Sequence, residues 1–175
     1  MSSPTTSEEF YAEAAKSFSY FNDFVGKMGL LGRARADHIG YKCASSESFE
    51  QMRKLLEGES QYVYQSIISK RRIAYFKLWT PLFTRFGNVY FFELADQKPD
   101  NSQKEGFDHI EVYPEGWAYE EMVHMLREKG LDMVKVERAH HTTHDLKISD
   151  PDGSSIIFRC TREKLIDKIK REQMS

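Results

Sequence analysis

The tripeptide Asp-His-Ile occurs twice in the sequence, and its two histidines are the first candidate metal ligands. His38 and His109 stand 71 positions apart in the chain. Each precedes a short run typical of a β-strand, residues 39–43 after the first and residues 110–113 after the second. A repeated strand that carries one imidazole per copy can place two nitrogen ligands opposite each other, so a repeat is the first feature to test.

A carboxylate and two further polar residues belong to the same candidate site. Glu93 lies within an apolar strand-like run, where a carboxylate is unfavourable unless it is paired or binds a metal. Because strand side chains alternate, Lys42 shares a face with His38, and Glu111 shares a face with His109. Two imidazoles and one carboxylate suit Fe(II), Mn(II), Ni(II) or Zn(II). We therefore predict His38, Glu93 and His109 as metal ligands, and we predict that Lys42, or Glu111 if it is not itself a ligand, moves a proton.

Each of these residues also has a purely structural interpretation. A histidine near the start of a strand is often half-exposed, and Glu93 could face solvent or pair with Lys42 or Lys77. Glu111 could supply an extra ligand oxygen, or it could form a salt bridge with Lys42 or Arg159. The coincidence of the three predicted ligands at repeat-equivalent positions favours the metal site over these alternatives.

The repeat extends beyond the histidines and predicts an α+β fold. In each half a strand is followed by an amphipathic helix and then by three strands, which gives two βαβββ modules over residues 36–95 and 107–160. Residues 1–30 and 161–175 add a helix at each end, and the polar residues 96–106 connect the modules. We expect one cupped mixed sheet in a single domain of residues 1–175.

Composition and charge narrow the class of protein. The chain has 175 residues, 40% of them apolar and 30% charged, which is ordinary for a globular domain. The formal net charge of −2 and the lack of a basic cluster predict no nucleic-acid partner. No apolar stretch approaches the roughly 20 residues of a membrane span. No secretory signal is visible, and Cys43 and Cys160 are too few for a disulfide framework, so we expect a cytoplasmic protein.

The ordered motifs resemble the vicinal oxygen chelate superfamily, which includes glyoxalase I, extradiol dioxygenases and the fosfomycin and bleomycin resistance proteins. Within that superfamily the chain is most similar to the bacterial YecM family. The segments that carry the resemblance are Ala36–Ile39, Phe76–Leu78, Phe92–Leu94, Gly106–Glu111 and Asp150–Gly153. The resemblance implies a divalent metal ion in the cup and a small-molecule substrate rich in oxygen.

The superfamily pattern includes a fourth ligand that this sequence lacks. That ligand is a glutamate on the last strand, and an alignment of residues 92–94 with residues 156–158 puts Ile157 at its position. The resemblance then implies a site of two histidines and one carboxylate, as in extradiol dioxygenases. Isomerase, lyase and dioxygenase chemistry stay open. So do a binding module without turnover, a structural metal and the oligomeric state, a homodimer included.

The other histidines form no recognised ligand pattern. His140, His141 and His144 cluster before a predicted strand, where they could be ligands, substrate contacts or ordinary loop residues. His124 lies on the polar side of a predicted helix and is expected at the surface.

Overall fold

Two halves with the same order of elements follow one another in the computed structural model, which describes residues 3–138 and 141–174. The first module consists of β1 (Ala34–Lys42), α2 (Ser46–Gly58), β2 (Ser60–Ile68), β3 (Arg71–Thr84) and β4 (Gly87–Ala95). The second consists of β5 (Gly106–Pro114), α3 (Tyr119–Glu128), β6 (Val134–Glu137), β7 (Thr142–Ser149) and β8 (Ser155–Cys160). Helix α1 (Ser7–Val25) precedes the modules, and helix α4 (Leu165–Met174) follows them.

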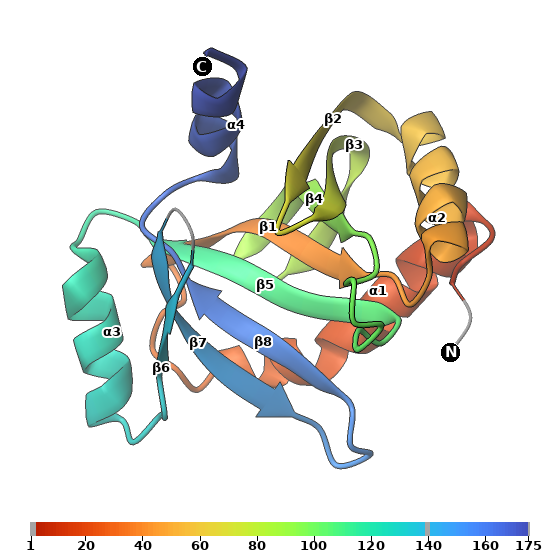
Figure 1. Ribbon diagram of the computed structural model, residues 1–175. Helices are drawn as coiled ribbons and strands as arrows, with labels where there is room; N and C mark the ends of the chain where they lie inside the picture. Colours follow the sequence, from red (N-terminus) through yellow and green to blue (C-terminus); the bar gives the residue numbers. More distant parts are fainter. Residues whose placement is uncertain (1–2, 139–140, 175) are drawn as a thin grey trace.

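Within the described residues, eight strands form one sheet in the order β2-β3-β4-β1-β5-β8-β7-β6 (Figure 1). The first strands of the two modules, β1 and β5, lie in the middle and pair antiparallel. Each of them also pairs in parallel with the last strand of its own module, β1 with β4 and β5 with β8. The sheet is therefore mixed, and the predicted α+β fold of two βαβββ modules is confirmed.

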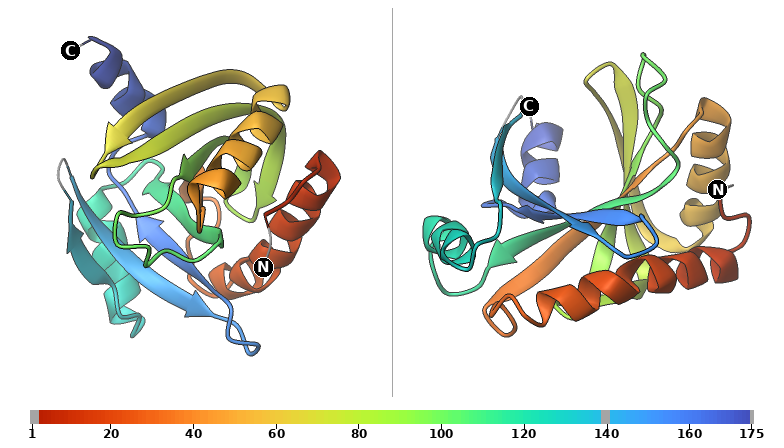
Figure 2. Two further views of the ribbon diagram at one scale, coloured as in Figure 1. Left: turned by 45° about the vertical axis from the view of Figure 1, so that its right-hand side comes forward. Right: turned by 90° about the horizontal axis from the view of Figure 1, so that it is seen from below.

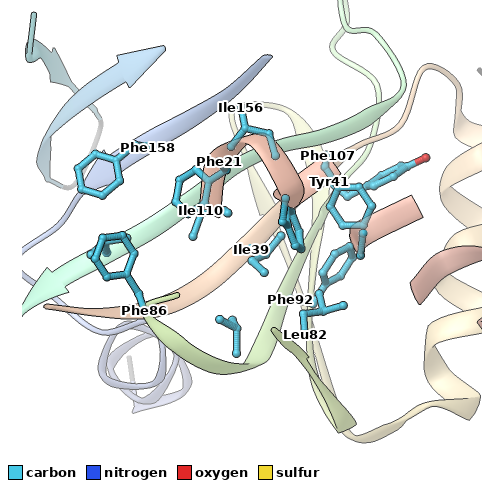
Figure 3. Packing of buried hydrophobic residues seen from close by; sticks show 14 of the residues in the cluster. Phe21, Ile39, Tyr41, Leu82, Phe86, Phe92, Phe107, Ile110, Ile156 and Phe158 are labelled. Atoms are coloured by element: carbon cyan, nitrogen blue, oxygen red, sulfur yellow. The ribbon is translucent and has the colours of Figure 1, made fainter. Parts of the chain in front are cut away.

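Helices α1, α2 and α3 cover the outer face of the sheet. Helix α1 lies across this face (Figure 2), and Thr6 caps it by accepting a hydrogen bond from the N–H of Glu9. One large apolar core joins the three helices to the sheet; Phe21, Ile39 and Phe158 are among its side chains in Figure 3. Full burial of each such side chain stabilises the fold by about 1.5–3 kcal/mol, so the outer face supplies the main core.

The two cysteines belong to this outer core. Cys43 and Cys160 are both free and fully buried. Burial raises the pKa of both thiols, so neither is a reactive thiolate. Both cysteines therefore lie on the face of the sheet opposite the polar side chains.

The inner face carries the polar side chains and a second, smaller apolar cluster. Helix α4 turns back over the first module, where Leu165 and Ile169 pack with Ile73, Tyr75 and Ala95 (Figures 1 and 2). The sequence predicts this helix but does not reveal the face that it covers. In the described part of the chain, no helix is both long enough and apolar enough to cross a membrane.

Candidate metal centre

Three side chains from three neighbouring strands converge on the inner face. His38 on β1, Glu93 on β4 and His109 on β5 each offer a ligand atom within 4.8 Å of the others. The two imidazole rings are nearly perpendicular, at 88°, with centroids 5.6 Å apart. Nε2 of His38 lies 3.8 Å from a carboxylate oxygen of Glu93. First-row divalent metals accept this set of donors.

The strand register explains why these side chains can meet. Gly40 of β1 lies between Glu93 on β4 and His109 on β5. The ring of His109 lies over this glycine, because a Cβ atom at position 40 would stand only 2.1 Å from Cε1 of the imidazole. A glycine inside a strand often marks such a close approach. Gly40 therefore makes room for the second predicted ligand.

Each histidine is held by the aspartate that precedes it. Nδ1 of His38 lies 2.8 Å from Oδ2 of Asp37, and Nδ1 of His109 lies 2.9 Å from Oδ2 of Asp108. Adjacent strand residues normally face opposite ways, but the pairing of β1 with β5 skips both aspartates. Such bulges re-aim a side chain. With Nδ1–H donated to a carboxylate, Nε2 keeps its lone pair for a metal.

Sequence reasoning missed both aspartates, although the repeat contained a signal for them. The repeated unit is Asp-His-Ile, so Asp37 recurs at Asp108 as faithfully as the first histidine recurs at the second. In a regular strand, an aspartate next to a histidine would face the opposite side of the sheet, away from the site.

Three buried polar atoms at this point lack a hydrogen-bond partner among the described residues. They are Nε2 of His38, Nε2 of His109 and Oε1 of Glu111. Oε2 of Glu111 lies 2.8 Å from Nε2 of His38, close enough for an ion pair when that imidazole is protonated. Buried polar atoms are normally satisfied, so the lone pairs of these atoms fit a site that holds a cation.

The surrounding charges affect the two histidines differently. Burial lowers the pKa of His38, but the carboxylates of Glu111 and Asp37 outweigh it and raise the pKa to about 10. Burial also lowers the pKa of His109, and the nearby charge of Arg159 adds to that effect. In the protein without a cation, His38 is therefore protonated and His109 is neutral. Burial alone would raise the pKa of Glu111, but the His38 imidazolium holds it well below its usual value.

The two predicted proton carriers occupy different surroundings. Glu111 touches the site through His38, whereas Lys42 forms an ion pair with Asp108. Lys42 and Asp108 line a groove of about 1210 Å³ that runs along α1 and the connection between the modules, and the predicted ligands do not line it.

One alternative from the sequence was a salt bridge of Glu111 with Lys42 or Arg159. This alternative is wrong, because the ion-pair contact of Glu111 is with His38.

The register corrects the position of the missing fourth ligand. Glu93 lies beside Gly40 of β1, and the equivalent place in the second module lies beside Glu111 of β5. Arg159 on β8 occupies that place. The assignment of Ile157 to it is wrong by two residues, because the alignment matched apolar runs instead of the pairing with the central strands. The fourth ligand is still absent, but a cation stands at its position.

The remaining histidines are dispersed. His124 is exposed and lies next to Glu128, as expected of a surface residue. The interpretation of His144 as a loop residue is wrong: it lies in β7, is buried, and its Nδ1 is 2.7 Å from the hydroxyl of Tyr119. His141 directly precedes β7, and its Nδ1 is buried without a hydrogen-bond partner in the described chain. His140 lies outside the described residues.

Comparison with known proteins identifies the family. The sequence matches the family model of the YecM protein over residues 10–162. The chain belongs to the YecM family. The YecM chain matches no curated protein. The predicted family is thus confirmed.

One solved structure confirms the fold, and two others match the chain less closely. A structural-genomics protein, EC4020, matches with a TM-score of 0.64 and 20% identity, over 93% of this chain and 92% of that one. Methylmalonyl-CoA epimerase from Mycobacterium tuberculosis matches with a TM-score of 0.49 and 15% identity, over 76% and 91%. A Streptomyces coelicolor methylmalonyl-CoA epimerase variant in complex with 2-nitronate-propionyl-CoA matches with a TM-score of 0.44 and 16% identity, over 75% and 99%.

Proposed function

We propose that this YecM-family protein binds one divalent metal ion through His38, Glu93 and His109 and acts with it on a small oxygen-rich substrate. The observation that carries the proposal is the pair of buried imidazole nitrogens, one from each module, that lack a hydrogen-bond partner in the described chain and face a carboxylate. The resemblance to the vicinal oxygen chelate superfamily supports a divalent metal and a small-molecule substrate at this site. Fe, Mn, Ni and Zn are the candidate ions.

The residues around the proposed ligands have separable roles. A bound divalent ion would polarise substrate oxygens as a Lewis acid. Asp37 and Asp108 orient the two imidazole rings through Nδ1. Glu111 lies beside His38, and its Oε1 has no hydrogen-bond partner among the described residues, so it is placed to accept a substrate proton. Lys42 is the second candidate proton carrier, and its ammonium group is held by Asp108.

A non-catalytic binding module with the same fold is the second candidate function. The observation that favours it is Arg159, because a guanidinium at the fourth-ligand position cannot bind a metal. The two candidates differ in metal content. Elemental analysis of the protein purified with and without added metal therefore separates them. Metal-free protein that binds an apolar ligand tightly would support the binding module.

Replacement of one predicted ligand tests the metal site directly. We expect His109→Ala to lower the affinity for Mn(II), Ni(II) and Zn(II) by at least about 100-fold, more than the loss typical of groups that only orient a ligand. Isothermal titration of metal into metal-free protein measures the affinity. His124→Ala is the matched control, because His124 is exposed and distant from the inner-face site. Equal losses in the two variants would show that the ligands are misassigned.

A further inference from the structure

Two guanidinium groups converge on one carboxylate next to the proposed metal centre. Arg159 on β8 donates hydrogen bonds from Nε and Nη2 to Asp145 at 3.1–3.2 Å. Arg138 donates from Nη2 to the same carboxylate at 3.0 Å. The Arg159 side chain is only 12% exposed, so it is a buried cation and not part of a solvated surface. Two positive charges and one negative charge leave this group with a net charge of +1.

The repeat directs Arg159 toward the same point as Glu93. Glu93 pairs with Gly40, which lies two residues after His38. Arg159 pairs with Glu111, which lies two residues after His109. Both pairs are parallel, with the histidine-bearing strand as partner. The side chain of Arg159 thus enters the inner face at the corner where the symmetry of the two modules would place a second carboxylate ligand.

Electrostatics are consistent with this closeness. Burial lowers the pKa of Arg159, but Asp145 and the charges of Glu111 and Glu93 outweigh it and raise the pKa. The guanidinium is therefore close enough to interact electrostatically with Glu93 and Glu111.

One edge of the guanidinium is free to bind a ligand. Asp145 occupies Nε and Nη2, whereas Nη1 makes no hydrogen bond within the described part of the chain. A guanidinium binds carboxylate oxygens through several N–H groups in one plane and stays charged at any physiological pH. A guanidinium at this corner has no lone pair to offer a metal ion, but it attracts an anion.

We propose that Arg159 binds a carboxylate of the substrate at the corner that a fourth metal ligand would otherwise fill. This inference rests on the proposed metal site. The matching substrate class is the 2-oxo and 2-hydroxy carboxylates. With a metal bound at the predicted ligands, such a molecule would offer adjacent oxygens to the metal and its remaining carboxylate oxygen to Nη1 of Arg159. Arg138 and Asp145 hold the guanidinium in place, so they position it without contacting substrate.

The test compares a charged and a neutral probe on Mn(II)-loaded protein. Oxalate carries two carboxylates, and oxamide has the same shape without charge. The Mn(II) affinity of each variant is measured first, followed by the affinity for each probe by titration calorimetry. We expect Arg159→Gln to bind Mn(II) within about threefold of the unaltered protein, to bind oxalate at least about tenfold more weakly, and to bind oxamide equally well.

Two further variants make the result decisive. Arg159→Lys keeps the charge and serves if loss of the Asp145 pair unfolds Arg159→Gln; it should lose oxalate affinity about threefold or more, because lysine lacks the planar fork. Arg162→Gln is the matched control, since Arg162 is half-exposed and pairs with Glu120 on α3. Unchanged oxalate affinity in the folded Arg159 variants, with Mn(II) bound, overturns the inference alone. Failure of the unaltered protein to bind Mn(II) overturns the proposed metal site and this inference together.

Discussion

At position 40, the absence of a side chain decides where the His109 ring can lie. A Cβ atom there would stand 2.1 Å from Cε1 and 2.4 Å from Nδ1 of that ring, far inside van der Waals contact. The ring is fixed on its other side by Asp108, so it has little freedom to move away. Gly40 does not have a positive φ angle, so alanine at this position tests the space beside the ring and not backbone strain.

Gly40→Ala should therefore displace His109 and lower metal affinity by at least about tenfold, comparable to the loss of a group that orients a ligand. Calorimetric titration with Mn(II) measures the effect. Gly58→Ala is the control, because a Cβ atom at Gly58 would meet nothing within 4 Å. An unchanged affinity in Gly40→Ala would mean that His109 is not a ligand, or that its ring lies elsewhere when metal binds.

The sequence predicts the candidate ligands, but it does not predict the residues that hold them in place. His38, Glu93 and His109 are recognisable because a strand repeat and an apolar run single them out, and the structure brings them together. Asp37 and Asp108 escaped because a bulge breaks the period of two, and a bulge depends on the pairing with another strand. No local sequence pattern marks where the pairing of β1 with β5 is interrupted by a bulge.

At the level of elements, helix α4 and His38 are hydrogen-bonded to the same carboxylate oxygen of Asp37. Oδ2 of Asp37 accepts hydrogen bonds from Nδ1 of His38 and from the backbone N–H of Leu165, the first residue of α4, each at 2.8 Å. A carboxylate at a helix N-terminus is favoured by the exposed N–H groups and the helix dipole. The docking of α4 and the orientation of His38 are therefore coupled through one side chain.

Loosening α4 should weaken the site without dissolving the fold. Ile169 is 1% exposed in the inner cluster, and its truncation to alanine typically costs about 2 kcal/mol or more. We expect amides of α4 in Ile169→Ala to exchange hydrogen on the order of 30-fold faster, and metal affinity to fall a few-fold. Exchange followed by mass spectrometry and Mn(II) titration report the two effects. Lys170→Ala, at the next and exposed position, should change neither. Faster exchange with unchanged affinity would uncouple α4 from the site.

The order of elements could be predicted because amphipathic periods are local, whereas strand register could not. Apolar spacing along residues 46–58 and 119–128 predicts both module helices. The pairing of β5 with β8 joins residues almost 50 positions apart (111 and 159), and no local period fixes it. A slip of two keeps every side chain on its face, so the alternation that identified the strands could not distinguish Ile157 from Arg159 at the fourth-ligand position.

Across the whole molecule, the main core and the proposed site lie on opposite faces of one sheet. Three helices bury the outer face in a large apolar cluster, and the predicted ligands lie on the inner face outside that cluster. We therefore expect folding not to depend on a metal, unlike small domains whose core is completed by an ion. Such a separation is expected of a site for chemistry rather than of a purely structural metal site.

Removal of metal should leave the protein folded but less stable. Binding to the native state alone adds RT ln(1 + [L]/Kd), about 2.7 kcal/mol at a free metal concentration 100 times Kd. For a chain of this length that corresponds to a rise in Tm of roughly 5–11 °C over the metal-free protein. Differential scanning calorimetry of the protein with chelator and with added Mn(II) measures this difference, and His109→Ala should lose it. Cooperative unfolding of the chelated protein at room temperature would assign the ion a structural role, because the outer core alone would then be insufficient for the fold.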